Sequence, residues 1–318
     1  MERQLHDEGI PLAAAQLRPD GEVPVLSNSF EDLRCKIFKV DFGDESWAIR
    51  VPNISEDSLE LRIHLLEAEV STLTELEEQG FQWAPKLKGY DFTFENPIRR
   101  PFIAVTWLPG NQLAWSDDTP ARPIRDKILQ QLAKIQAALI ECSQEKRATT
   151  ATEHYAGVIQ NKIIRIRDGT LPELTEQDVS DQLSLLPTVL LPEVDDTSWA
   201  IDHSELVAEN ILIDAEHNIT GITTWDLASK MPLQQAASFP AILLYQDLAV
   251  PPSSTIKKDQ ETYTASISQE SPAGESMAIV QSSKEADFRV AFLESITSKG
   301  THREMARNGW RKAPAFQK

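Results

Sequence analysis

Hydrophobic and polar residues alternate along two short stretches, residues 35–42 and 46–51, which a Gly-Asp-Glu sequence separates. In the first stretch, alternation places Phe38, Val40 and Phe42 on one face of an extended segment. Alternating patterns on both sides of a short polar turn predict a β-hairpin.

A helical pattern follows this hairpin. Residues Ser55 to Gly80 carry acidic residues early and a glycine at the end, which predicts one long helix. Residues 102–108 (FIAVTWL) predict a buried strand that ends at a Pro-Gly pair. We therefore expect an N-terminal β-rich lobe with one helix over residues 25–110, preceded by an N-terminal extension at residues 1–24.

Residues 111–318 have a mainly helical pattern. Apolar residues at helical spacing predict a helix from about Arg122 to Gln144. Residues 201–210 read as a loop, and the strands of a short hairpin are expected at 211–213 and 219–223. These features predict a larger, helical C-terminal lobe.

Composition narrows the class of partner. The 318 residues include 31 Lys and Arg against 49 Asp and Glu, for a formal net charge of -18. Nucleic acids and anionic membranes need a basic surface, so neither is expected as a partner. The two cysteines, Cys35 and Cys142, provide no disulfide framework or metal cluster. With no apolar run of about 18 residues and no signal-peptide pattern, we expect a cytoplasmic protein.

The most informative segment is IDHSELVAENILID, residues 201–214, followed by GITTWD at residues 221–226. It resembles the pattern His-Gly-Asp-Leu-x-x-x-Asn-Ile-Leu-Val-Asp, then Gly-Ile-Ile-Asp-Trp, of the aminoglycoside phosphotransferase (phosphotransferase enzyme) family. His203, Leu206 and Asn210 are among the matching residues. The continuation through residues 232–240 is similar to fungal members of that family.

Upstream residues agree with the resemblance in order and spacing. Ala48-Ile49-Arg50 stands where kinase-like folds have Ala-x-Lys on the third strand, and Arg50 for lysine is ordinary in fungal relatives. Glu69, in the long helix, is suited to pair with Arg50. The backbone from Thr106 to Leu108 corresponds to the segment that would contact adenine. The resemblance covers about residues 25–245.

The resemblance implies an α+β, two-lobed, protein-kinase-like fold. Its N-terminal lobe would hold an antiparallel sheet plus one helix. Its larger C-terminal lobe would be mainly helical and would carry the catalytic-type loop at residues 201–226.

Three departures from the family pattern bear on phosphoryl transfer. The family's catalytic Asp is Glu205, whose extra methylene shifts the carboxylate by about an ångström, a displacement that can cost ~100-fold in rate. The Asp that would bind magnesium is Thr224, although magnesium prefers carboxylates and phosphates. The expected turn between the first strands, Ser27 to Asp32, contains no glycine to approach the phosphates. Asp226 follows two residues after Thr224, and we expect it to point away from the metal position.

The resemblance implies a role for each of these residues. Glu205 and His203 are the candidate catalytic residues, with a structural hydrogen bond as the alternative role for His203. The candidate cofactor-binding residues are Arg50, Glu69, Thr106, Leu108, Asn210 and Thr224. No metal ligand is assigned, and the Arg50–Glu69 pair could also brace the lobe without a nucleotide.

The preferred hypothesis is a kinase-like protein impaired in phosphoryl transfer, with an interlobe cleft for a small molecule. It could be a binding pseudokinase, or an enzyme repurposed for metal-independent cyclisation or isomerisation with Glu205 and His203 as acid and base. The alternative is an active ATP-dependent small-molecule O-phosphotransferase, which would require ATP and magnesium. A scaffold acting through surface contacts ranks last. The sequence names neither the ligand nor the oligomeric state.

Overall fold

A computed structural model describes residues 5–31, 34–53, 59–244, 247–268 and 271–316. The chain divides into two compact units, each described by itself below. The first unit contains residues 1–113 and 209–228, and the second contains 114–208 and 229–318. The segment 201–226 is therefore split, because the β-hairpin after residue 208 makes its contacts with the first unit.

The first unit is built on an antiparallel sheet in the order β1-β2-β3-β5-β4. Its strands are β1 (Val25–Glu31), β2 (Cys35–Asp41), β3 (Ser46–Pro52), β4 (Leu87–Asp91) and β5 (Phe102–Thr106). The expected hairpin is β2–β3, whose register pairs Asp41 with Ser46. Phe38, Val40 and Phe42 are all buried, as their alternation predicts.

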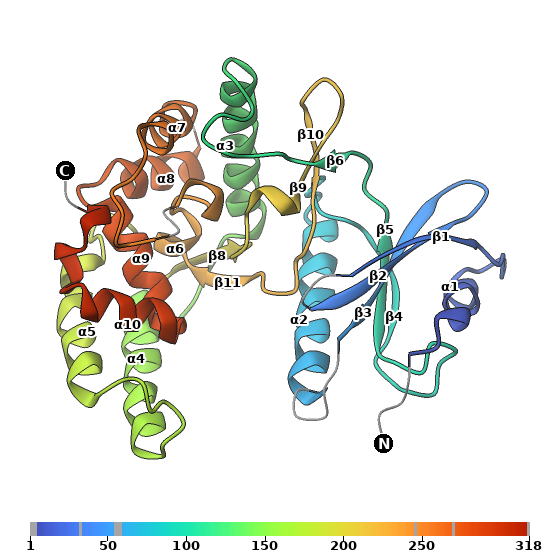
Figure 1. The fold of residues 1–318 in the computed structure, drawn as a ribbon, viewed down its shortest axis with the longest axis horizontal. Coiled ribbons are helices and arrows are strands. Elements are labelled where there is room, and N and C mark those ends of the chain that lie inside the picture. Colours follow the sequence, from blue (N-terminus) through green and yellow to red (C-terminus); the bar gives the residue numbers. More distant parts are fainter. Residues whose placement is uncertain (1–4, 32–33, 54–58, 245–246, 269–270, 317–318) are drawn as a thin grey trace. The chain divides into compact units, whose positions relative to one another are not determined.

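Two helices cover opposite faces of this sheet (Figure 1). Helix α1 (Ile10–Leu17) packs on the Trp47 and Ile49 face, so this part of the expected N-terminal extension completes the core of the first unit. Helix α2 (Leu59–Glu78) covers the face that carries Arg50. The expected helix start at Ser55 lies outside the described residues.

The expected turn from Ser27 to Asp32 is wrong. Residues 25–31 form strand β1, which pairs with β2 from Val25↔Asp41 to Glu31↔Lys36, and Asp32 lies outside the described residues. All seven β1 residues are exposed, so the strand shows no alternating burial. Backbone hydrogen bonding to β2 therefore holds these residues extended without the pattern that predicts a strand.

A smaller sheet completes the first unit, in the order β10-β9-β6. Its strands are β6 (Asn111–Gln112), β9 (Ile211–Ile213) and β10 (Ile219–Ile222), so the second predicted hairpin is present. Gly110 precedes β6 with φ of +120°, and an added Cβ there would lie 2.6 Å from Thr220 Oγ1. Only glycine fits this position, because backbone conformation and space both exclude a side chain.

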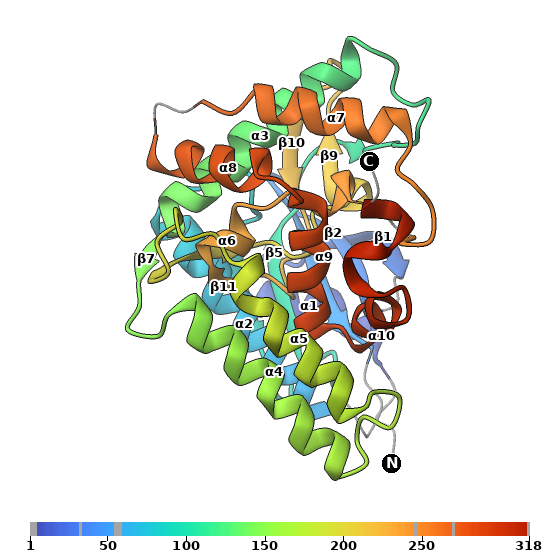
Figure 2. The same cartoon turned by 90° about the vertical axis from the view of Figure 1, so that its left-hand side faces the viewer.

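The second unit is mainly helical (Figure 2). Its helices are α3 (Ile124–Ser143), α4 (Ala151–Arg167), α5 (Glu176–Val189), α6 (Leu233–Ala236), α7 (Ser254–Ala265), α8 (Pro272–Ser282), α9 (Ala286–Thr297) and α10 (Lys299–Arg307). The predicted helix at 122–144 is α3. Helices α4, α5, α9 and α10 share one core that includes Tyr155, Leu186, Phe292 and Met305.

A short antiparallel sheet in the second unit has the order β11-β8-β7. Its strands are β7 (Glu145–Lys146), β8 (Ser198–Asp202) and β11 (Ser229–Pro232), with Asp202 opposite Ser229. This pairing fixes the backbone from which the loop after Asp202 departs.

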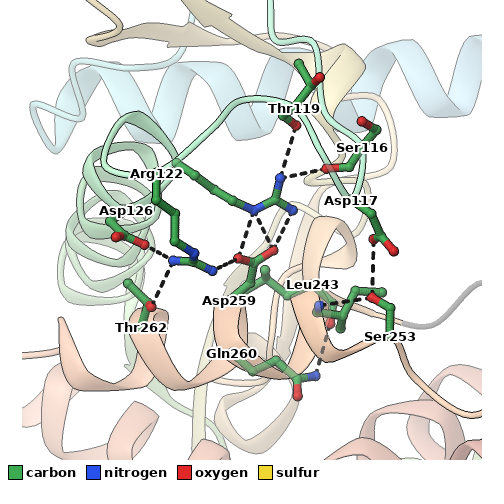
Figure 3. Close-up of polar contacts among 12 residues, drawn as sticks. Ser116, Asp117, Thr119, Arg122, Asp126, Leu243, Ser253, Asp259, Gln260 and Thr262 are labelled. Carbon is green, nitrogen blue, oxygen red and sulfur yellow. Dashed lines mark hydrogen bonds and ion pairs between the residues drawn. The ribbon is translucent and has the colours of Figure 1, made fainter.

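Buried charges join helix α7 to the start of α3 (Figure 3). The Arg125 guanidinium donates to both carboxylate oxygens of Asp259, at 2.5 to 2.8 Å, and to the carbonyl of Ser116. Arg122 donates to the same Asp259 carboxylate at 2.5 Å. Asp259 is fully buried, so two guanidiniums compensate the charge of one buried carboxylate.

The α+β fold predicted from the sequence is confirmed, with an antiparallel N-terminal sheet and a helical C-terminal part. Within the described residues, no helix combines the length and the apolar character that crossing a bilayer would require.

Candidate functional site

A buried ion pair links strand β3 to helix α2 in the first unit. Ala48 and Arg50 share the sheet face opposite Trp47 and Ile49, so Arg50 points toward α2. Its guanidinium pairs with the carboxylate of Glu69, which is 1% exposed. The predicted Arg50–Glu69 pair is therefore present.

Asp226 belongs to the same buried charge cluster. Its carboxylate lies 3.9 Å from Arg50 Nη2 and 3.4 Å from Arg34 Nε. Burial, and to a smaller extent the charge of Asp226, raise the pKa of Glu69 against the attraction of Arg50. Asp226 is thus a neighbour of the Arg50–Glu69 pair, a contact that the sequence analysis did not anticipate.

The β9–β10 hairpin brings Asn210 close to the segment that contains Thr224. Ile222 pairs with Ile211, and the Thr223 amide donates to the Asn210 carbonyl at 2.9 Å. Thr224 then adopts a left-handed backbone, with φ of 64°. This conformation is strained for a β-branched residue and is tolerated better by Asp or Asn.

Trp225 fixes the end of this segment. The indole is fully buried, donates from Nε1 to the Ile222 carbonyl at 2.9 Å, and contacts Phe81 edge-on. The indole therefore packs in the core of the first unit and is not available for stacking on a ligand.

The predicted adenine-contacting segment, Thr106 to Leu108, continues from strand β5. The Thr106 amide donates to the Lys86 carbonyl and the Trp107 amide to the Ser46 carbonyl, each at 2.9 Å. Leu108 packs against Gly221, where an added Cβ would come within 2.6 Å of the leucine side chain. The amides of Thr106 and Trp107 therefore already donate to backbone carbonyls. Of the three residues, Leu108 is the one whose amide we would test as a hydrogen-bond donor to adenine.

The residues at the magnesium position do not fit that ion well. Thr224 supplies a neutral hydroxyl, and the nearby carboxylate of Asp226 is ion-paired with two guanidiniums. A divalent cation there would be repelled by Arg34 and Arg50. Among the described residues, no group of three or more His, Cys, Asp and Glu side chains is placed to hold a metal.

His203 and Glu205 lie in the second unit, in the loop after strand β8. The Glu205 amide donates to the His203 carbonyl at 2.8 Å, and Ser204 between them has φ of 65°. This is the position of the family's glycine, so the loop keeps a backbone that glycine adopts most easily. His203 is buried and Glu205 is half-buried.

A cavity of about 500 Å³ lies beside this loop, entirely within the second unit. Its lining mixes apolar residues such as Leu139, Phe239 and Leu293 with polar residues such as Gln136 and Glu294. His203 lines it and Glu205 is not among its lining residues. The volume is that of a pocket for a small organic molecule.

Asp202 is a carboxylate of this cavity that sequence reasoning missed. It accepts hydrogen bonds from the Ser204 amide at 3.0 Å and from Gln235 Nε2 at 3.1 Å. Gln235 in turn accepts from the Tyr155 hydroxyl at 3.1 Å. Burial raises the pKa of Asp202, while the two donated hydrogen bonds oppose this rise. The sequence did contain a signal for Asp202, because an acidic residue at the end of an apolar strand and directly before His203 is unusual for a purely structural position.

Comparisons with known proteins agree with this fold. A structure of aminoglycoside phosphotransferase APH(2'')-Ib with ADP bound matches with a TM-score of 0.60 and 10% identity, covering 98% of this chain and 99% of that one. A protein of Ralstonia eutropha JMP134, assigned as an aminoglycoside phosphotransferase, matches with a TM-score of 0.57 and 11% identity, covering 98% and 96%.

A third structure, the streptomycin–ATP ternary complex of APH(2'')-IIa, matches with a TM-score of 0.55 and 9% identity, covering 92% and 94%. Comparison with curated protein sequences gives no match. The profile of the phosphotransferase enzyme family matches residues 36–235, more than half of the chain. The chain therefore belongs to the phosphotransferase enzyme family.

Proposed function

We propose that this chain binds a small molecule and is impaired in phosphoryl transfer from a magnesium–nucleotide complex. The observation that carries this proposal is Thr224, which occupies the family's magnesium position. A hydroxyl supplies neither the charge nor the bridging oxygen of a carboxylate. Phosphoryl transfer depends almost entirely on positioning and on charge stabilisation by magnesium and cationic side chains.

The nearest substitute for the missing carboxylate also supports impairment. Asp226 is ion-paired with Arg34 and Arg50, and binding magnesium would require it to give up those contacts. Glu205 adds a second change, because its longer side chain stands at the position of the catalytic Asp. We expect Thr224 and Glu205 each to lower the rate of phosphoryl transfer. Thr224 affects the binding of magnesium, and Glu205 affects the activation of the acceptor hydroxyl.

The cavity of about 500 Å³ supports the binding of a small molecule. It combines apolar side chains with polar groups, of which the Asp202 carboxylate is oriented by two hydrogen bonds. One solved relative of similar fold holds streptomycin together with ATP. The ligand class proposed here is accordingly a small organic molecule.

A second candidate function is metal-independent acid–base chemistry in the same cavity, as in a cyclisation or isomerisation. Asp202 favours it, because burial raises the pKa of this carboxyl group and two hydrogen bonds orient it, as in carboxyl groups that act as general acids or bases. His203 lines the same cavity and is the second proton-transfer group. Glu205 does not line this cavity, so this candidate function assigns proton transfer to Asp202 and His203.

Calorimetry with ATP, with and without magnesium, tests the proposed impairment. We expect magnesium to leave nucleotide affinity unchanged within about twofold, because the chain supplies no anionic anchor for the metal. An active O-phosphotransferase would instead show a magnesium-dependent thermal shift that Asn210→Ala abolishes. Phosphate transfer to a small molecule at about 1 s⁻¹ or faster, an ordinary rate for kinases, would overturn the proposal.

A further inference from the structure

A second, very small cavity lies within the first unit, at the buried charge cluster. Its volume is about 20 Å³, and its lining includes Arg34, Cys35, Arg50, Arg62, Glu69 and Asp226. A cavity of this size holds a single water-sized molecule, provided that polar partners are present.

Three buried atoms of these lining residues make no hydrogen bond within the described part of the chain. They are Glu69 Oε2, Asp226 Oδ1 and Arg62 Nε. Glu69 and Asp226 are 1% and 8% exposed, so bulk water does not solvate their carboxylates fully. A buried polar atom without a partner costs about 1–3 kcal/mol, which favours a small guest that donates to two acceptors and accepts from one donor.

Cys35 places a thiol at this guest position. On strand β2 it has the same side-chain direction as Ile37, which pairs with Arg50 across the β2–β3 ladder. Its Sγ lies 3.8 Å from Arg50 Nη2. The cavity lining carries three guanidiniums against two carboxylates, and neighbouring cationic side chains are typical surroundings of reactive cysteines.

We propose that Cys35 is a modification site for hydrogen peroxide, which the small cavity admits in place of water. The Cys35 thiolate attacks one peroxide oxygen, the S–O bond forms and the O–O bond breaks. The leaving hydroxide takes up a proton and departs as water. Sulfur is oxidised by two electrons to a sulfenic acid, and the peroxide is reduced.

This inference is independent of the proposed function, because it requires neither nucleotide nor small-molecule substrate. Hydrogen peroxide matches the cavity because it donates two hydrogen bonds and accepts others. Oxidation also replaces a charged partner of Arg50 by a neutral one. Arg50 then keeps Glu69 and Asp226 as its anionic partners.

The chain contains an internal control. Cys142, the second of its two cysteines, lies in α3, is more exposed than Cys35, and donates to the Leu139 carbonyl at 3.3 Å. If exposure alone governs oxidation, Cys142 reacts first. If the charge cluster governs it, Cys35 reacts first.

The test treats the full chain with micromolar hydrogen peroxide at neutral pH, traps sulfenic acid with dimedone, and maps the adducts by mass spectrometry. We expect Cys35 to be labelled at least tenfold faster than Cys142, and Arg50→Gln to slow Cys35 labelling at least tenfold. In urea-unfolded protein the two cysteines should react at similar rates. Circular dichroism verifies that each variant is folded.

Arg34→Gln provides a second variant if Arg50→Gln does not fold, and it should slow Cys35 labelling at least threefold. Equal or faster labelling of Cys142 in the folded chain would overturn the inference. So would an unchanged Cys35 rate in whichever arginine variant folds.

Discussion

The Asp226 carboxylate lies 3.9 Å from the Arg50 guanidinium, which stands where kinase-like folds have the lysine of the third strand. Asp226, two residues after Thr224, is thus already engaged with a guanidinium. Thr224 stands where the family pattern has Asp, and it has a left-handed backbone that Asp adopts more easily than threonine.

Arg50, Glu69 and Asp226 form one buried charge cluster. Replacing different members of this cluster should lower the free energy of unfolding by different amounts. Arg50→Met leaves the buried Glu69 carboxylate without its main partner beside a second carboxylate, and should destabilise the fold by about 3–5 kcal/mol. Glu69→Gln leaves Arg50 next to Asp226 and should cost clearly less. Urea unfolding measures both. Equal losses would show that Asp226 is not part of the cluster.

The Arg125–Asp259 ion pair should contribute strongly to holding helix α7 against helix α3. Asp259→Asn leaves two guanidiniums without their shared carboxylate, and we expect a loss of about 3–5 kcal/mol in the free energy of unfolding. Glu176→Gln is the matched control, because it removes one partner of the exposed Arg167–Glu176 pair. That variant should unfold at the same urea concentration as the unaltered chain.

A buried histidine predicts a loss of stability in acid. His302 accepts from Lys162 through Nδ1 at 3.0 Å and donates from Nε2 to the Asp178 carbonyl at 3.1 Å. Burial, followed by the Lys162 charge, lowers its pKa from 6.5 to about 4. Between pH 6.5 and 4 the unfolded chain takes up a proton that the folded chain does not, so stability should fall as pH is lowered.

His302→Gln tests this assignment, because glutamine can accept from Lys162 and donate to Asp178 without titrating. The slope of melting temperature against pH should become shallower between pH 6.5 and 4 in the variant. An unchanged slope would assign acid sensitivity to other groups.

The raised pKa of Asp202 predicts how the stability of the fold depends on pH. Burial raises its pKa in the folded chain, so its contribution to stability is present below the unfolded pKa of about 3.8 and declines as pH rises through the folded value. Asp202→Asn should therefore be more favourable for stability at pH 7 than at pH 3.5. Chemical unfolding at the two pH values measures the difference, and the opposite order would contradict a raised pKa for Asp202.

Sequence patterns predicted the elements with strong periodicity. Alternation along residues 35–42 gave one hairpin, and helical spacing gave α2 and α3. The hairpin and the two helices depend on local sequence, so they could be predicted without coordinates. The ion pair between Arg50 and Glu69 was instead implied by the resemblance to kinase-like folds, which have a basic residue at this place on the third strand.

Other features depend on tertiary contacts that the pattern does not encode. Strand β1 is fully exposed and carries no alternation, and α1 is only eight residues long, so neither gave a clear signal. The contact of Asp226 with Arg34 depends on how the segment after β10 turns. The orientation of Asp202 depends on Gln235 and Tyr155, which lie far from it in the sequence.

The most direct test of the account is to restore the missing carboxylate. Thr224→Asp suits the left-handed backbone better than threonine, so the variant should fold at least as stably as the unaltered chain. We predict that magnesium tightens ATP binding at least tenfold in Thr224→Asp and less than twofold in the unaltered chain, measured by calorimetry. Strong magnesium dependence in the unaltered chain would contradict the account.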